Sequence, residues 1–88
     1  MASGKVCGII SNTTNGNMQQ FSTEITLTQA ALVYITGASS HTAVCIVKID
    51  SDTLFVTSGG AGENNLFIAP KGAKIAMQHG TGYYTPMG

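Results

Sequence analysis

The stretch from Glu63 to Gly88 constrains the fold more than any other part of this sequence. It contains three short strand-like runs separated by turn residues: Leu66–Ala69, Lys74–Met77 and Tyr83–Tyr84, with Pro70-Lys71-Gly72 and Gly80-Thr81-Gly82 between them. Proline and glycine at such positions favour turns, and the runs are too short for stable helices. The stretch therefore predicts an antiparallel β unit.

The rest of the chain repeats this pattern. Further strand-like runs precede the C-terminal stretch: Lys5–Ile10, Gln19–Leu27, Leu32–Thr36, Thr42–Ile49 and Thr53–Thr57. Gln19–Leu27 alternates apolar and polar residues, as a strand with one wet face does. Thr42–Ile49 is apolar on both faces, which predicts a central strand buried on both sides. We expect an all-β protein, a small antiparallel β-sandwich or jelly roll of about eight short strands.

The connections are typical of turns and loops. Asn15-Gly16 predicts a hairpin turn because both residues tolerate a positive φ angle. Asp50-Ser51-Asp52 predicts the next turn, and Ser58–Gly62 a flexible loop. Thr28–Leu32 is compatible with a short helical turn capped by Thr28, although the residues that follow favour a strand.

A chain of 88 residues is one domain, residues 1–88. A monomer of this size buries only about 60–65% of the surface that its unfolded chain exposes, so it needs further support. Cys7 and Cys45 are too few for a disulfide scaffold, and no Cys and His spacing matches a zinc site. Whether these two cysteines pair stays open. Oligomerisation is the favoured support.

Charge leads to the same expectation. Charged residues make up 9% of the chain, with a formal net charge of zero, whereas about 25% is typical of soluble domains. A surface of Thr, Ser, Asn, Gln and Gly suits a protein covered by protein partners. The composition argues against nucleic-acid binding, which needs a basic stripe, and against binding to an anionic membrane.

The N-terminal residues and the longest apolar run bear on where the protein is located. Met1–Lys5 is not followed by the apolar run of a signal peptide. Ala30–Ile35, the longest apolar stretch, is far shorter than the ~20 residues needed to span a bilayer. We therefore expect synthesis in the cytoplasm of the producing cell.

The candidate catalytic residues have simpler interpretations. Asp50 and Asp52 could share acid–base work or bind calcium, but Asp-Ser-Asp is ordinary turn chemistry. Cys45 with His41 could be a nucleophile and base, yet Cys45 lies in the most apolar strand and His79 beside a turn. The glycine run at residues 59–62 lacks the Lys-Ser/Thr of a phosphate loop. We expect no enzyme, no cofactor and no metal.

The four aromatic residues Tyr34, Phe67, Tyr83 and Tyr84 admit two interpretations. They could form a platform on which a sugar stacks, or they could pack in the core or at a subunit interface, where tyrosine is enriched. The interface is favoured.

The order of an apolar strand, the corner Ala69-Pro70-Lys71-Gly72, a strand at Lys74-Ile75, a glycine turn and a closing Tyr83-Tyr84 resembles small virion proteins of tailed bacteriophages. These are head-decoration proteins and fibre or needle knobs with a jelly roll like that of tumour necrosis factor or C1q. The resemblance implies a homotrimer located in the virion.

We therefore expect a structural phage protein that binds the major capsid protein, or another virion protein, as a decoration protein. A fibre or needle knob, or another receptor- or carbohydrate-binding module, is the alternative. Strand signals begin at Lys5 with no shaft segment before them, which favours decoration. The predicted subunit-interface residues are Val44, Ile46, Phe55, Phe67 and Tyr84. The loops at residues 12–17 and 58–65 are predicted partner contacts, with Asn15, Gly16, Gly60 and Asn64 as representatives.

Overall fold

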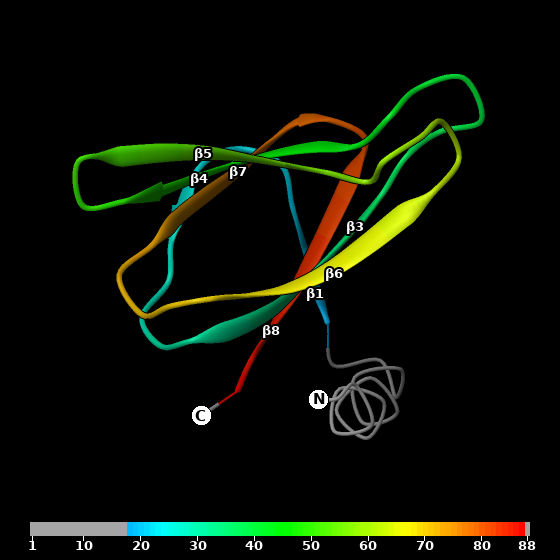
Figure 1. Cartoon of the computed structure of the whole chain (residues 1–88). Helices are drawn as coiled ribbons and strands as arrows, with labels where there is room; N and C mark the ends of the chain where they lie inside the picture. The colour runs from blue at the N-terminus through cyan, green and yellow to red at the C-terminus, as the bar shows by residue number, and fades with distance from the viewer. Residues whose placement is uncertain (1–17, 88) are drawn as a thin grey trace, which may run out of the picture.

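Eight strands make up the regular structure of this computed structural model, which describes residues 18–87. They are β1 (Gln19–Phe21), β2 (Ile25–Thr26), β3 (Ala31–Thr36), β4 (Val44–Ile49), β5 (Asp52–Thr57), β6 (Asn64–Ala69), β7 (Lys74–His79) and β8 (Thr81–Pro86). Sheet A has the order β1-β8-β3-β6 and sheet B the order β2-β7-β4-β5. The two sheets lie as two layers in Figure 1, with β4, β5 and β7 in the upper layer. The prediction of an all-β sandwich is confirmed.

The strand order is that of a jelly roll. The pairs β1·β8, β2·β7, β3·β6 and β4·β5 follow the pattern of one long hairpin, and β3·β8 and β4·β7 complete the two sheets. All of these pairs are antiparallel. A hairpin folded across two sheets in this way gives the eight-stranded jelly roll.

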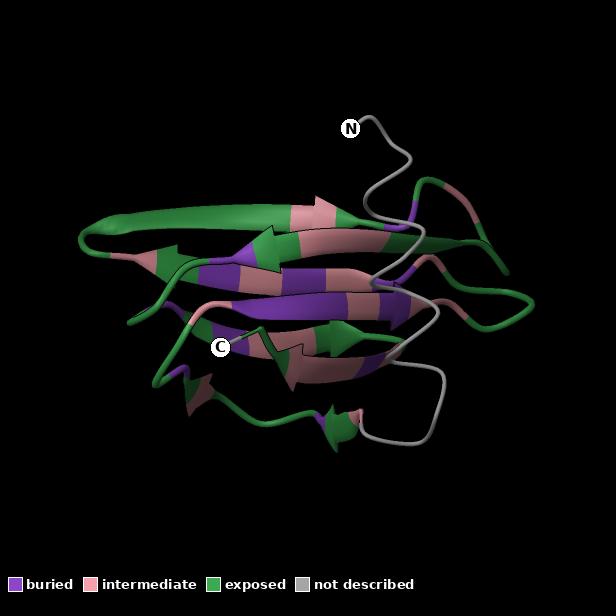
Figure 2. Ribbon diagram, turned by 90° about the horizontal axis from the view of Figure 1, so that it is seen from below, coloured by how far each residue is buried: buried purple, intermediate pink, exposed green. Residues whose placement is uncertain are grey.

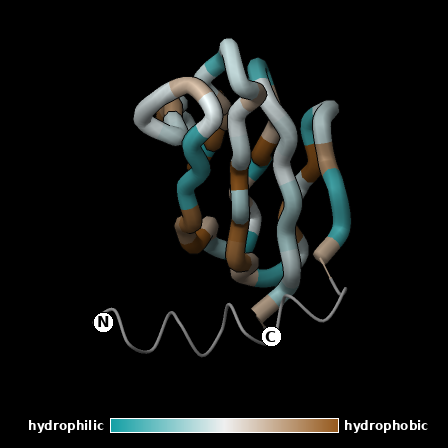
Figure 3. Tube along the Cα trace, turned by 90° about the vertical axis from the view of Figure 1, so that its right-hand side faces the viewer, coloured by the Kyte–Doolittle hydropathy of each residue, from teal (hydrophilic) through white to brown (hydrophobic). Residues whose placement is uncertain are grey.

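Strand periodicity places the core between the sheets. Figure 3 shows apolar residues alternating with polar ones along several strands, as expected for strands with one buried face. In sheet A, Ala31, Val33 and Ile35 of β3 belong to the core cluster. In sheet B, Cys45 and Val47 of β4 face them together with other core residues. The burial pattern of Figure 2 follows the same alternation.

The prediction of one strand over Gln19–Leu27 is wrong. The chain makes β1 in sheet A, then crosses to sheet B for β2. The change of sheet begins at Ser22, whose carbonyl accepts a hydrogen bond of 2.9 Å from the amide of Met77 in β7. Phe21 and Ile25 both pack on the core from opposite sheets, so local alternation continues although the strand does not.

The strand predicted at Thr42–Ile49 is central, as expected, and begins at Val44. Its second face is less buried than predicted. Cys45 and Val47 are buried, whereas Val44 and Ile46 are only half buried. Their side of sheet B is the outer one, which faces away from sheet A. The predicted strand at Lys5–Ile10 and the hairpin turn at Asn15-Gly16 lie outside the described residues.

Turns follow the predicted chemistry. Asp50, between β4 and β5, has a φ of 56°, and Gly72, between β6 and β7, a φ of 89°. Both are left-handed conformations that aspartate and glycine tolerate. Before β3 the chain bends at Thr28 and Gln29 without a helical turn. Leu27 is held there by hydrogen bonds of its backbone to Gly72 and Ala73.

Candidate functional site

The outer face of sheet A carries two rows of aromatic and apolar side chains. In the strand register Tyr34 of β3 lies between Tyr83 of β8 and Leu66 of β6. The Tyr34 and Tyr83 rings are 6.2 Å apart between centroids, with 35° between their planes. In the next row of the same face, Leu32 of β3, which is only 1% exposed, lies beside Ile68, which is 54% exposed. We call the four residues that keep solvent access, Tyr34, Tyr83, Leu66 and Ile68, the tyrosine face.

The strands of sheet A hold no charged side chain. None of the four sequences QQF, ALVYIT, NNLFIA and TGYYTP contains Asp, Glu, Lys or Arg. Sheet B differs, since Lys48, Lys74 and Asp52 lie in its strands. Lys48 also forms an ion pair of 3.4 Å with Glu24. The two outer faces therefore differ in kind: that of sheet B carries charge, and the tyrosine face has none.

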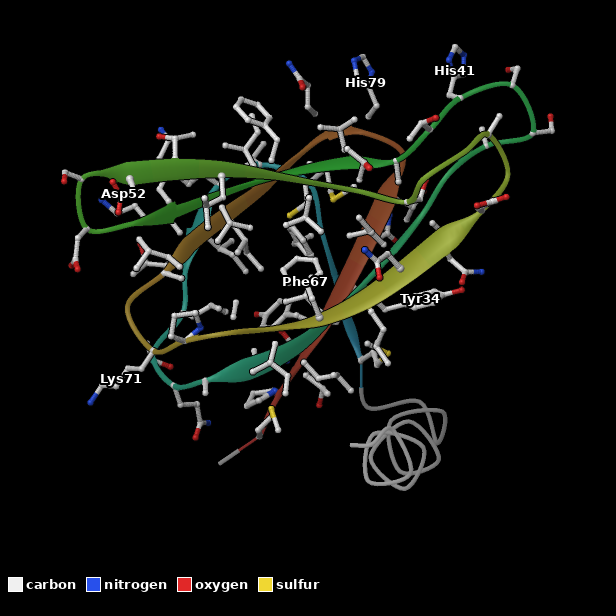
Figure 4. All side chains as sticks on the ribbon, in the orientation of Figure 1. Tyr34, His41, Asp52, Phe67, Lys71 and His79 are labelled. Carbon is white, nitrogen blue, oxygen red and sulfur yellow. The ribbon has the colours of Figure 1, made fainter. Side chains whose placement is uncertain are left out.

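The four aromatic residues that the sequence grouped together do not form one platform. Tyr34 and Tyr83 lie on the outer face of sheet A, whereas Phe67 and Tyr84 pack against the core. Figure 4 shows Phe67 between the two layers and Tyr34 at the outside of the sandwich. Tyr83 and Tyr84 are consecutive in β8, and consecutive residues of a strand point to opposite faces. This rule could have separated them from the sequence alone.

The five predicted interface residues fall into two groups. Val44, Ile46 and Phe55 lie on the outer face of sheet B, where Phe55 is 60% exposed. Phe67 and Tyr84 are half buried against the core. Whether any of the five contacts a second subunit stays a prediction. Sequence reasoning missed Leu66 and Ile68, which their alternation with the inward-facing Phe67 and Ala69 could have placed on the outer face.

The predicted contact loops are described in part. Gly60 lies half buried in the β5–β6 loop, and Asn64 begins β6 and is exposed. Ser58 organises this loop: its hydroxyl accepts a hydrogen bond from the amide of Ala43 (2.9 Å) and donates one to the carbonyl of Gly60 (3.1 Å). Asn15 and Gly16 lie outside the described residues.

A small pocket opens between the sheets near β1 and β2. It has a volume of about 120 Å³. Its lining residues are Gln19, Ile25, Thr26, Leu27, Thr28, Gln29, Ala31, Tyr84 and Pro86. The Tyr84 hydroxyl donates a hydrogen bond of 2.9 Å to the side-chain carbonyl of Gln19. With no ionisable group except this phenol, the pocket has no acid–base or nucleophilic pair.

The candidate catalytic residues do not meet. Cys45 is fully buried on the inner side of β4, whereas His41 is exposed in the loop before that strand. Figure 4 shows His41 and His79 at the periphery and Asp52 at the far end of the β4–β5 hairpin. No group of three or more His, Cys, Asp or Glu side chains that could hold a metal ion occurs within residues 18–87.

Burial changes the chemistry of Cys45. Desolvation raises the pKa of its thiol from 9.0 to about 11, and a backbone hydrogen bond with Ala76 opposes this shift. At neutral pH the thiol is therefore protonated, and the thiolate needed for nucleophilic attack is scarce. The surroundings of Cys45 are those of a structural residue.

The raised pKa predicts a loss of stability at alkaline pH. Folded Cys45 holds its proton more tightly than unfolded Cys45. Its contribution to the free energy of unfolding is therefore complete below pH 9 and disappears between pH 9 and about pH 11. One pKa unit corresponds to about 1.4 kcal/mol, so the loss should not exceed about 3 kcal/mol. Urea unfolding of wild type and Cys45→Val from pH 8 to pH 11 measures it. Parallel pH profiles for the two proteins would contradict the prediction.

Comparison with protein-family models, with curated proteins and with solved structures gives no match for this chain. In the part of the chain that the structure describes, no helix has the length and hydropathy to cross a membrane. The jelly roll and the contrast between its two outer faces are therefore the features that bear on function.

Proposed function

We propose that this chain is a non-enzymatic structural subunit that forms a homotrimer and decorates a larger protein shell, the capsid of a bacteriophage. The observation that carries the proposal is the tyrosine face. Protein interfaces are depleted of charged residues at their centres and enriched in tyrosine. An uncharged sheet with half-buried tyrosines beside an exposed isoleucine fits a surface that protein partners cover.

The geometry of the tyrosine face makes it a better candidate for partner contact than the outer face of sheet B. Tyr34 lies on a central strand, flanked in register by Tyr83 and Leu66, so the rigid sheet holds these side chains in one row. The outer face of sheet B instead carries the Lys48–Glu24 pair, which would lose hydration if a partner covered it. We therefore assign self-association and shell contact to sheet A, and solvent exposure to most of the outer face of sheet B.

The variant Tyr34→Lys tests this assignment. A lysine in the middle of the tyrosine face would be desolvated without a counter-charge. At low micromolar concentration we expect wild type to have about three times the 9.1 kDa chain mass. Tyr34→Lys should have the mass of one chain. Sedimentation velocity and binding to capsids stripped of decoration protein are the two measurements.

The matched control is Gln78→Lys, which adds the same charge at an exposed position of β7 in sheet B. We expect this control to keep the wild-type mass and the wild-type binding to stripped capsids. A monomeric wild-type chain, or equal capsid binding by wild type and Tyr34→Lys, would overturn the proposal.

The Tyr34–Tyr83 pair also supports a second candidate, a receptor- or carbohydrate-binding module, because exposed aromatic faces stack on sugars. A glycan array distinguishes it from the first. Binding to a defined glycan that is lost in Tyr34→Ala, with no binding to capsids, would favour the second candidate.

A further inference from the structure

The outer face of sheet B places an apolar row beside a basic row. Ile46 and Lys48 of β4 both point outward, because Val47 between them is buried in the core. In the strand register Ile46 lies opposite Phe55 of β5, and Lys48 lies opposite Lys74 of β7. These three strands are neighbours in the upper layer of Figure 1. We call Ile46, Phe55, Lys48 and Lys74 the basic–apolar face.

The two lysines of this face repel each other. Directly opposed residues of antiparallel strands have Cα atoms about 4.5–5.5 Å apart, and like charges there are destabilising. Within residues 18–87, the ion pair that either lysine forms is that of Lys48 with Glu24, at 3.4 Å. Asp50 and Asp52 belong to the end of the β4–β5 hairpin, past this pair. One carboxylate thus serves two ammonium groups, and the face attracts a second.

The apolar row is open to solvent. Phe55 is the most exposed large apolar side chain of the described residues, at 60%. Beside it lie Ile46 and, further along β4, Val44, both half buried. Val44, Ile46 and Phe55 are three of the five residues that the sequence predicts at an interface, and aromatic side chains are enriched at interfaces. The structure adds that this apolar surface has a basic border.

The size and the charge of the face favour a protein segment among anionic partners. Nucleic acids and anionic membranes are held by stripes or clusters of many basic residues, whereas this face has Lys48 and Lys74. A small anion such as phosphate would make no use of Ile46 and Phe55. An extended peptide matches both rows, because its residues two positions apart point to the same side and lie about 7 Å apart. That is also the spacing from Ile46 to Lys48.

We propose that the basic–apolar face binds an extended segment of another protein in which a carboxylate follows an aliphatic or aromatic residue by two positions. The apolar side chain packs on Ile46 and Phe55, and the carboxylate pairs with Lys48 and Lys74. Since the partner brings its own carboxylate, the lysines keep a counter-charge when they lose water.

This contact goes beyond the proposed function and does not use the tyrosine face. One peptide segment buries far less than the ~1,200 Å² of a standard interface. The contact is therefore weak and reversible, and the outer face of sheet B stays open to solvent for most of the time.

A blocked peptide with the repeat Leu-Ser-Glu-Ser is the probe for this contact. In a nuclear magnetic resonance titration we expect it to shift the backbone amide signals of Ile46, Lys48, Phe55 and Lys74. The affinity should fall several-fold at high salt, because the lysines are exposed. Peptides with the repeats Leu-Ser-Lys-Ser and Ser-Ser-Glu-Ser lack the carboxylate and the apolar residue, respectively, and each should bind at least fivefold more weakly.

Two charge variants should change the affinity in opposite directions. Lys74→Gln should weaken binding by about two- to fivefold, the range for one exposed ion pair. Glu24→Gln should strengthen it by a similar factor, because it removes the carboxylate that competes for Lys48. Structural damage would weaken binding in both variants. Lys71→Gln is the matched control: it removes the same charge in the turn before β7 and should bind the peptide as wild type does.

Phe55→Ser tests the apolar row and should weaken binding at least fivefold without changing the fold, since Phe55 is largely exposed. Tyr34→Lys, on the opposite outer face, should bind the peptide as wild type does, so failure of the trimer and failure of this contact are distinguishable. Equal binding of Leu-Ser-Glu-Ser and Leu-Ser-Lys-Ser, or weaker binding by Glu24→Gln, would overturn the proposal. So would tighter binding to a single-stranded oligonucleotide or to phosphatidylserine vesicles than to the peptide.

Discussion

Replacing Phe21 by alanine is expected to lower the free energy of unfolding by about 3–5 kcal/mol, the range for a buried phenylalanine. Phe21 is 5% exposed and belongs to the core cluster, although β1 is a short edge strand. Its ring meets that of Tyr84 edge-on, with 5.9 Å between centroids and 74° between planes. Such pairs contribute about 0.5–1.5 kcal/mol beyond the area they bury.

Urea unfolding at a concentration where the chain is monomeric measures this effect. Domains of this size have total stabilities of roughly 5–10 kcal/mol, so the variant should be near the limit of folding. Phe55→Ala is the control, because Phe55 is 60% exposed and its truncation should cost less than about 0.5 kcal/mol. Equal losses for the two variants would mean that Phe21 does not hold β1 on the core.

Local chemistry made the strands after Leu27 predictable. The runs at Leu66–Ala69 and Lys74–Met77 appear as β6 and β7, each extended by two residues at one end. The sequence identifies them because Pro70 and Gly72 mark the turn between them without any tertiary information. The central place of β4 was equally predictable from its apolar residues, although the sequence predicted burial of both faces and only the side of Cys45 and Val47 is buried.

Pairing partners were not predictable in the same way. Alternation in Gln19–Leu27 is the same whether the chain continues in one sheet or crosses to the other, because both routes keep Phe21 and Ile25 on the core. The same limit applies to β5. Nothing within DTLFVT distinguishes an edge strand from a central one, and only its place in sheet B leaves one side open.

Part of the candidate surface could be predicted from the sequence. Tyr34 and Tyr83 were part of the predicted carbohydrate-binding platform together with Phe67 and Tyr84, but the sequence neither separates these two pairs nor shows that Tyr34 and Tyr83 are neighbours. That contact depends on the pairing of β3 with β8, strands far apart in the chain. The absence of charge from sheet A likewise becomes visible only when four separate segments are assigned to one sheet. Composition predicts the low charge of the whole chain, and the topology brings the uncharged strands together in sheet A.

Gly82→Val is expected to destabilise the protein by at least the upper end of the ~1–3 kcal/mol typical of overpacked cores. Gly82 lies opposite Phe21 in the pairing of β1 with β8. A Cβ atom there would stand 2.7 Å from the ring of Phe21 and 2.6 Å from the sulfur of Met77. The backbone of Gly82 is not left-handed, so the cost comes from these contacts. Gly82 makes room for the Phe21 ring on the inner face of sheet A.

The double variant Phe21→Ala/Gly82→Val tests that relation directly. With the ring removed, the valine side chain fills part of the space, so the combined loss should be smaller than the sum of the two single losses by about 1–3 kcal/mol. Gly72→Ala is the control: its Cβ would meet nothing within 4 Å, and its φ of 89° makes the cost one of backbone strain. Phe21→Ala should not relieve that strain, so those two losses should add. If the Gly82 pair also adds, the ring and the glycine are independent, and the close approach of β1 to β8 has another cause.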